Sequence, residues 1–243
     1  IVDGQIYSDW IYHAPVKSRC IFEYIYFART DSIIDGQSVY SSRVRAGSIL
    51  AEKYLVDADL VIGVPESGLA AAVGYSQGSN IPYGMAFYKN SYVGRTFIKP
   101  KQNERTAGVQ AKLNVIRDVV KGKRVVMVDD SIVRGTTIRN IVKMLKDAGA
   151  LEVHVRISSP PFKHPCYYGT DVPSSENLVA VNNTIDEIKE SINADSLGFL
   201  DIEDLGQLCP GLDYCDACFT GKYAGGIPSD PSKTNSCSSK IVL

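Results

Sequence analysis

V-V-M-V-D-D-S-I-V-R-G-T-T, residues 125–137, is the stretch of sequence that decides the fold class. Its four leading apolar residues predict a buried strand, and the adjacent carboxylates Asp129 and Asp130 follow that strand directly. A loop of small residues comes next, and apolar residues at helical spacing from Ile138 to Leu145 predict a helix. Strands that alternate with helices are typical of an α/β protein with a mainly parallel sheet, in which ligands bind at the carboxyl ends of the strands.

Each part of this stretch suits recognition of a sugar phosphate. The two carboxylates suit ribose hydroxyls or a hydrated Mg²⁺. The following loop offers backbone N–H groups and hydroxyls at a helix N-terminus, where a phosphate monoester binds well, and its glycine permits close approach. A strand, turn and N-cap without a ligand is the alternative, and the double aspartate disfavours it. The loop residues concerned are Ser131, Arg134, Gly135, Thr136 and Thr137.

The same stretch resembles the phosphoribosyl-diphosphate signature of type I phosphoribosyltransferases. Four other motifs resemble the amidophosphoribosyltransferase family: Y-I-Y-F-A-R at 24–29, V-P-E-S-G-L-A at 64–70, Y-V-G-R-T-F-I at 92–98 and C-F-T-G-K-Y at 218–223. The resemblance implies a type I phosphoribosyltransferase fold. It also implies a pentosyltransferase that forms 5-phosphoribosylamine from phosphoribosyl diphosphate and glutamine-derived ammonia, the first committed step of purine (IMP) biosynthesis.

The resemblance further implies roles for residues at two strand ends. Asp129 and Asp130 are expected to be catalytic and, with Ser67, to bind Mg²⁺. The backbone around Glu66, Ser67 and Gly68 is expected to hold the pyrophosphate. Taken without the resemblance, Ser67 also fits a plain helix N-cap.

Residues 90–106 form a polar segment that is long for an idle connection, which favours a functional lid over the phosphates. The resemblance assigns Arg95 a catalytic role and Lys99 a substrate-binding role. The alternative is a solvated surface loop.

The chain has six cysteines. Disulfides are disfavoured in a long chain without a secretory signal, so a metal or a cluster is preferred. The C-x-x-C pair at 215–218 fits zinc, redox or cluster chemistry when taken alone. The resemblance implies a [4Fe–4S] cluster, and leaves Cys209 and Cys237 as free thiols. The implied cluster ligands are Cys20, Cys166, Cys215 and Cys218.

The bulk composition is that of an ordinary globular chain. The 243 residues carry a formal net charge of −1 and no basic run, so we expect neither a nucleic acid nor a membrane as a partner. The chain begins at Ile1 rather than Met, so we expect a native N-terminal part to precede it. A leader peptide therefore cannot be used to predict the location of the protein. The expected location is the cytoplasm or an organelle such as a plastid.

Composition and resemblance divide the chain into four parts. Residues 1–25 are expected to be the remnant of a glutaminase domain, 26–160 the phosphoribosyltransferase domain, 161–223 a cluster-binding extension and 224–243 a disordered tail. Periodicity predicts helices and strands within these parts. The helices are expected at 39–54, with Arg43 among its polar residues, and at 109–119, 138–148 and 185–192; the strands at 60–64, 81–88, 123–128 and 153–157.

The expected partners are phosphoribosyl diphosphate, ammonia from glutamine, and purine nucleotides as feedback inhibitors, in a homo-oligomer. Two alternatives share the fold. A regulator that senses phosphoribosyl diphosphate would need a DNA-binding head, and a salvage phosphoribosyltransferase acting on a purine base would need no cysteine quartet.

Overall fold

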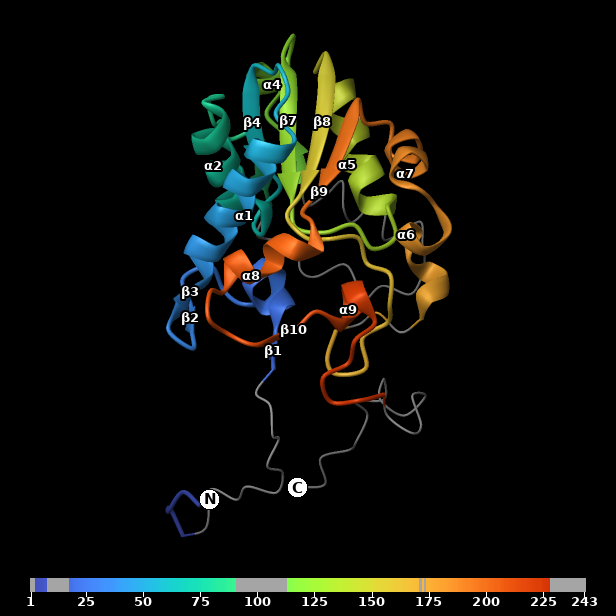
Figure 1. The fold of residues 1–243 in the computed structure, drawn as a ribbon. Coiled ribbons are helices and arrows are strands. Elements are labelled where there is room, and N and C mark those ends of the chain that lie inside the picture. The colour runs from blue at the N-terminus through green and yellow to red at the C-terminus, as the bar shows by residue number, and fades with distance from the viewer. Residues whose placement is uncertain (1–2, 8–17, 91–112, 171, 173, 228–243) are drawn as a thin grey trace.

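The computed structural model describes residues 3–7, 18–90, 113–170, 172 and 174–227. Its centre is a four-stranded parallel sheet in the order β4-β7-β8-β9 (Figure 1). Runs of Val, Ile and Met are buried on both faces of this sheet, as expected when helices cover both sides. The strands are β4 (Leu60–Gly63), β7 (Arg124–Asp129), β8 (Glu152–Ile157) and β9 (Ser196–Phe199).

Helices cover the two faces of this sheet. α1 (Val39–Lys53) and α2 (Gly68–Ser79) lie on one face, and α5 (Thr136–Asp147) and α7 (Ile185–Ser191) lie on the other (Figure 1). Successive strand residues point to opposite faces, so Val126 packs in the core under α1 and α2 while Val125 packs in the core under α5.

Glycines allow α1 and α2 to touch backbone to backbone. A Cβ on Gly47 of α1 would lie 1.8 Å from the carbonyl oxygen of Ala71 in α2. A Cβ on Gly74 of α2 would lie 1.8 Å from the carbonyl oxygen of Val44 in α1. No side chain fits at either position, so the two helices depend on these glycines for their close packing.

Short elements surround the sheet. β1 pairs with β10 in parallel, while β2–β3 and β5–β6 are antiparallel pairs. Their bounds are β1 Arg19–Cys20, η1 Glu23–Phe27, β2 Ile33–Ile34, β3 Gln37–Ser38, β5 Phe87–Lys89, β6 Leu113–Val115, α4 Arg117–Val120, η3 Ser175–Asn177, α6 Val179–Asn182, η4 Ile202–Asp204, α8 Leu205–Leu208, β10 Tyr214–Cys215 and α9 Ala217–Thr220.

The segment after β9 docks on α1. The Ser42 hydroxyl donates a hydrogen bond to the carbonyl oxygen of Leu208 over 2.5 Å. Lys53 pairs with Asp201 at 2.7 Å and with the buried carboxylate of Asp204. Leu205 and Leu208 are buried in the same core as α1 and α2, so this segment and the sheet share one core.

Most of the secondary structure expected from periodicity is confirmed. The helices at 39–54, 138–148 and 185–192 and the strands at 60–64, 123–128 and 153–157 correspond to α1, α5, α7, β4, β7 and β8. No helix in the described part of the chain is long and apolar enough to cross a membrane.

Two expectations are wrong. Instead of a strand at 81–88, the chain makes an isolated bridge from Tyr83 to Val61 and then the short β5. Of the helix expected at 109–119, the structure describes residues 113–119; Leu113–Val115 form β6, and a short helix, Arg117–Val120, follows. β6 pairs with β5, which is distant in sequence, and such tertiary pairing overrides a local helical pattern.

Candidate active site

Two buried carboxylates lie at the carboxyl end of β7. Asp129 is the last residue of the strand, Asp130 follows it, and their exposed fractions are 9% and 8%. The backbone N–H of Asp130 donates to Asp129 Oδ1 over 2.9 Å. Burial and the neighbouring Asp130 carboxylate raise the pKa of Asp129 well above its ordinary value. A cation bound here would relieve that repulsion.

Ser67 joins these carboxylates from the end of the neighbouring strand. It is the N-cap of α2, yet its side chain makes no capping hydrogen bond. Its hydroxyl instead donates to Asp130 Oδ2 over 2.5 Å. Burial raises the pKa of Asp130, and the hydroxyls of Ser131 and Ser67 act in the opposite direction. The structure thus brings together the three residues for which the family resemblance predicted a Mg²⁺ site.

Gly68 makes this meeting possible. β4 pairs in parallel with β7, which places Gly63 beside Val128. A Cβ on Gly68 would lie 2.4 Å from the carbonyl oxygen of Val128, so the first turn of α2 lies against the end of β7. Any side chain at this position would push Ser67 away from Asp130.

The loop from Ser131 to Gly135 leads from the carboxylates to α5. The Ser131 hydroxyl donates to Asp130, and buried Ile132 anchors the loop in the core. Gly135, with φ of 78°, is the N-cap of α5, a conformation that glycine adopts without strain. The side chains of Arg134, Thr136 and Thr137 are exposed around this helix N-terminus. A phosphate group can therefore approach the backbone N–H groups of the first turn.

Glu66 and a lysine that the sequence did not single out border the same strand ends. Glu66 is exposed and pairs with Lys89 Nζ at 3.1 Å. Lys89 belongs to β5, whose true position the periodicity missed. An exposed pair of this kind contributes little stability, so Lys89 is free to exchange Glu66 for an anionic ligand.

A second residue that the sequence did not single out is Arg43. It was expected among the polar residues of a helix, but it is 3% exposed. Its guanidinium donates to the carbonyl oxygens of Tyr24, Tyr26 and Ala28 and to the Thr30 hydroxyl. It also interacts electrostatically with Asp130. Arg43 thereby fixes the turn that follows Cys20.

Arg95 and Lys99, the expected catalytic and substrate-binding residues of the lid, lie outside the described residues.

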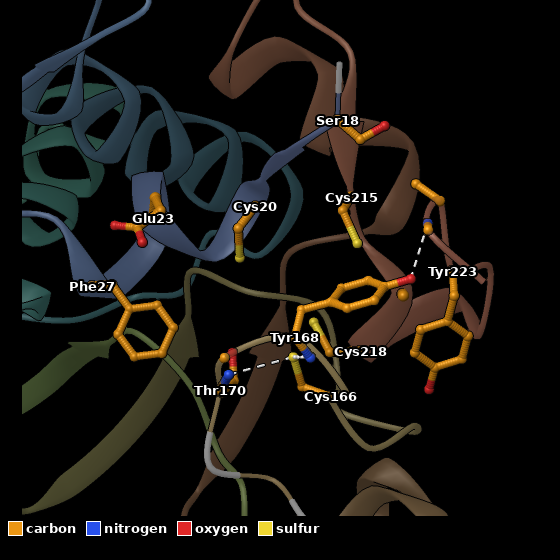
Figure 2. A pocket seen from close by; sticks show the side chains of 14 residues that line it. Ser18, Cys20, Glu23, Phe27, Cys166, Tyr168, Thr170, Cys215, Cys218 and Tyr223 are labelled. Atoms are coloured by element: carbon orange, nitrogen blue, oxygen red, sulfur yellow. Dashed lines mark hydrogen bonds between the residues drawn. The ribbon is translucent and has the colours of Figure 1, made fainter. Parts of the chain in front are cut away.

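Four cysteines from distant segments line one cavity of ≈ 960 Å³ (Figure 2). The parallel pairing of β1 with β10 places Cys20 directly opposite Cys215. Cys218 comes from α9, and Cys166 comes from the turn after β8. These are the four predicted ligands. Cys209 is buried in the core away from the cavity lining, and Cys237 lies outside the described residues.

The four thiols differ in their surroundings. Burial, followed by the charges of the neighbouring cysteines, raises the pKa of Cys218 strongly. Burial also raises the pKa of Cys166, but hydrogen bonds from the backbone N–H groups of Tyr168 and Thr170 to its Sγ lower that pKa overall. Among the described residues, no three His, Cys, Asp or Glu side chains are arranged to hold a single metal ion.

Comparison with known proteins identifies the family. The phosphoribosyl transferase domain matches residues 43–167, just over half of the chain. The amidophosphoribosyltransferase of Synechocystis sp. is 50% identical over 231 residues, which is 94% of this chain and 46% of that protein. The amidophosphoribosyltransferase of Bacillus subtilis is 53% identical over 221 residues, which is 88% of this chain and 46% of that protein.

Solved structures of similar proteins point to the same family. The glutamine phosphoribosylpyrophosphate amidotransferase of B. subtilis, complexed with ADP and GMP, is 53% identical with a TM-score of 0.78, over 86% of this chain and 47% of that one. A structure described as the allosteric regulatory enzyme of purine biosynthesis is 53% identical with a TM-score of 0.80, over 88% of this chain and 47% of that one. The expected type I phosphoribosyltransferase fold is thus confirmed, and the chain spans about half the length of the curated relatives it matches. The chain belongs to the phosphoribosyl transferase domain family, within which its similarity to amidophosphoribosyltransferases extends over most of its length.

Proposed function

We propose that this chain carries the phosphoribosyl-transfer site of an amidophosphoribosyltransferase. At this site ammonia, derived from glutamine in the whole protein, displaces pyrophosphate from phosphoribosyl diphosphate and gives 5-phosphoribosylamine. This is the step expected to open purine biosynthesis. The names of the relatives at about 50% identity support the choice of reaction.

The observation that carries the proposal is the meeting of Ser67 with Asp130 at adjacent strand ends, beside the loop that leads to α5. Residues 66–68 follow β4 and residues 131–137 follow β7, at the carboxyl ends of adjacent parallel strands, where ligands of parallel sheets bind. A substrate with a phosphate at one end, ribose hydroxyls in the middle and a pyrophosphate at the other end matches this arrangement.

The proposed mechanism assigns three tasks to the chain. The first turn of α5 binds the 5′-phosphate through backbone N–H groups, and Asp129 and Asp130 accept hydrogen bonds from the ribose hydroxyls. The turn at residues 66–68 orients the pyrophosphate. The nitrogen lone pair of ammonia then forms the bond to C1 as the C1–O bond breaks, the bond pair leaves on the pyrophosphate oxygen, and the nitrogen releases a proton to solvent. Fixed orientation and preorganised donors supply most of the catalysis.

We also propose that Ser67, Asp129 and Asp130 hold Mg²⁺ together with the substrate. Two buried carboxylates and a hydroxyl form an oxygen donor set that Mg²⁺ prefers, and a cation bound between them would offset the repulsion of the adjacent carboxylates. When bound, Mg²⁺ supplies charge neutralisation for the departing pyrophosphate.

A direct assay tests the reaction. The purified chain, given phosphoribosyl diphosphate, Mg²⁺ and ammonium at alkaline pH, should release pyrophosphate in an ammonia-dependent manner, because part of the ammonium is then unprotonated NH₃. The double variant Asp129→Asn with Asp130→Asn should lose pyrophosphate release by roughly a thousandfold, as expected when electrostatic groups at the reacting centre are removed.

The control is Asp147→Asn, since Asp147 is an exposed residue at the end of α5 that pairs with Lys143. This variant should keep the parental rate. Unchanged turnover in the double variant would contradict the site. Binding of phosphoribosyl diphosphate without turnover would favour the sensing regulator, and turnover with a purine base in place of ammonia would favour the salvage enzyme.

We further propose that Cys20, Cys166, Cys215 and Cys218 bind a [4Fe–4S] cluster. Four cysteines on one cavity form the thiolate donor set of such a cluster. A single zinc ion draws its four ligands close together, whereas each thiolate of a cubane binds a different iron and stands farther from the others. The resemblance to amidophosphoribosyltransferases is the reason for proposing iron rather than zinc, since four thiolates suit either metal.

Elemental analysis tests the cluster. Anaerobically prepared protein should be brown and contain about four irons per chain. Replacing any of the four cavity cysteines with Ser should abolish iron binding, whereas Cys209→Ser and Cys237→Ser should retain it. About one zinc per chain and no iron would overturn this proposal, as would loss of iron in the Cys209 variant.

Purine nucleotides are proposed as feedback inhibitors, and a homo-oligomer as the assembly. The B. subtilis relative complexed with ADP and GMP supports the former. Inhibition of the ammonia-dependent assay by GMP or AMP, with no inhibition by the pyrimidine nucleotide UMP, is the expected result. Sedimentation of the chain as a monomer at all concentrations would contradict the assembly.

A further inference from the structure

A short C-terminal segment, residues 223–226, lies over the cysteine cavity; we call it the strap. The hydroxyl of Tyr168, in the turn that carries Cys166, joins the turn to the strap. It accepts a hydrogen bond from the backbone N–H of Gly225 over 2.9 Å and donates one to the carbonyl oxygen of Gly226 over 2.8 Å. Figure 2 shows the first of these bonds as a dashed line beside the cysteines.

Tyr223 attaches the other end of the strap. Its hydroxyl donates to the carbonyl oxygen of Pro165 over 2.7 Å. Its ring lies 5.0 Å from the ring of Tyr167 and 6.1 Å from that of Tyr168, centre to centre. Residues 224–227, which were expected to begin a disordered tail, are thus continuous with the hydrogen-bonded wall of the cavity.

The strap is exposed on its outer side and forms cavity wall on its inner side. Ala224 and Gly225 are exposed to solvent, and both line the cavity together with Tyr168 and Tyr223. Cys218 is buried and the other three cavity cysteines are partly buried, and the strap forms one wall of the cavity that all four line. A solute that approaches from the strap side must displace the strap to reach them.

We propose that the strap is a latch that controls the entry of small solutes to the four cavity cysteines, and that the Tyr168 hydroxyl holds it closed. The biological meaning rests on the proposed cluster, because a latch would then protect the cluster from oxidants and chelators. The arrangement of the four thiols and the strap does not depend on iron, so the opening of the strap can be tested in metal-free protein.

The strap is suited to open independently of the fold. It is short, largely exposed, and held by side-chain hydrogen bonds at two points, and its inner side lines the cavity. Segments of this kind open by local fluctuation at a small fraction of the free energy of global unfolding. Removing one hydroxyl that makes two hydrogen bonds should therefore raise the open population roughly tenfold.

Thiol alkylation of the full metal-free chain measures the opening. The protein is treated with a chelator, reduced, and exposed to iodoacetamide, and mass spectrometry follows each cysteine separately. In Tyr168→Phe, alkylation of Cys166, Cys215 and Cys20 should be roughly tenfold faster than in the parent. The backbone N–H groups that contact Cys166 Sγ are unchanged by this substitution, so the intrinsic reactivity of that thiol is preserved.

Two controls separate opening of the latch from general loosening. Cys209 is 1% exposed in the core and does not line the cavity, so its alkylation rate should not change. Tyr40→Phe, at a tyrosine that is 47% exposed compared with 48% for Tyr168, should leave all rates at the parental value. Tyr223→Phe should accelerate the same cavity cysteines, because it releases the other end of the strap.

Parental alkylation rates in both Tyr168→Phe and Tyr223→Phe would overturn the latch, and so would equal acceleration of Cys209 and the cavity cysteines. A second measurement uses protein prepared with iron: the rate of iron transfer to an external chelator should rise in Tyr168→Phe. If no preparation binds iron, the cluster proposal fails while the alkylation result still decides the latch.

Discussion

At the scale of single residues, the two carboxylates at the end of β7 lower the stability of the ligand-free fold and are suited to bind a cation. Asp129 and Asp130 are buried next to each other, and the hydroxyls around them satisfy only part of their hydrogen-bonding capacity. Burying carboxylates without a cation costs free energy, and a bound cation would recover it. The site is therefore expected to be a weak point of the ligand-free fold.

The first prediction concerns Asp129→Asn in the absence of divalent cations. The pKa of Asp129 is raised in the fold. The protonated side chain therefore contributes to the free energy of unfolding, fully below the pKa of the unfolded chain, and this contribution is lost as the pH rises through the pKa of the fold. Asparagine cannot ionise, so at neutral pH the variant should be more stable than the parent by on the order of 1 kcal/mol. The gain should vanish near about pH 4, where the aspartate approaches protonation.

Melting temperatures across this pH range check the prediction. Asp147→Asn, at an exposed residue, should show no such gain. A variant at Asp129 that melts lower than the parent at neutral pH would contradict the expected cost of the buried charge.

The second prediction compares two serines at helix N-caps. Ser38 caps α1 by accepting the backbone N–H of Ser41, whereas Ser67 makes no such bond to α2 and donates to Asp130. Ser38→Ala should destabilise the fold by ~1 kcal/mol and leave the KM for phosphoribosyl diphosphate unchanged. Ser67→Ala should have a smaller effect on stability and should reduce ammonia-dependent pyrophosphate release at least tenfold. Urea unfolding and steady-state kinetics measure both; equal behaviour of the two variants would rule out a ligand-binding role for Ser67.

At the scale of elements, the contact between α1 and α2 sets the position of the site. α2 begins at residues 66–68, the turn proposed to orient the pyrophosphate, and α1 carries Arg43, which fixes the turn after Cys20. The two helices approach closely because Gly47 and Gly74 have no side chains. This contact therefore links the strand-end site to the cysteine-bearing segment.

The third prediction follows from that contact. Gly47→Ala would place a Cβ 1.8 Å from the carbonyl oxygen of Ala71, and a backbone atom cannot move aside as the end of a flexible side chain can. The variant should lose about 3 kcal/mol or more of unfolding free energy. Gly206→Ala in α8 is the matched control, since the nearest atom to its Cβ, the Tyr214 hydroxyl oxygen, lies 3.7 Å away. Denaturant titration of both variants provides the measurement, and equal stability would refute the close packing.

At the scale of the whole molecule, the C-terminal extension is part of the central core. Leu205, Leu208 and Phe219 of the extension belong to the same buried cluster as Val126 of the sheet. Contacts of this kind make unfolding cooperative, unlike the contacts of a detachable domain.

The fourth prediction is that Leu208→Ala destabilises the whole chain. Leu208 is 1% exposed, so its truncation should cost about 2–5 kcal/mol. Unfolding followed by circular dichroism and by hydrogen exchange in β7 should show one transition with a single midpoint. Leu151→Ala, at a residue that is 65% exposed, should have a negligible effect. Two separate transitions, with β7 unaffected, would show that the extension folds as an independent unit.

The parts of the fold that local pattern governs could be predicted. The strand at 125–128 and the helix after Gly135 follow from apolar runs and from apolar residues at helical spacing. The segments at 81–88 and 109–119 could not be predicted, because β5 and β6 are stabilised by pairing with each other rather than by their own sequences. Lys89 was missed for the same reason.

The sequence by itself determined the class of fold and the two strand ends that bear the candidate site, because each is encoded by a short motif whose chemistry is local, while the four cysteines were predicted together only through the family resemblance. Only the tertiary structure decided which of these residues meet. Ser67 reaches Asp130 because Gly68 lies against Val128, Arg43 is buried because carbonyl groups from a distant turn surround its guanidinium, and the Tyr168 hydroxyl has its partners because the strap folds back over the cavity. Contacts between residues far apart in the chain depend on packing and register, and no local pattern specifies those.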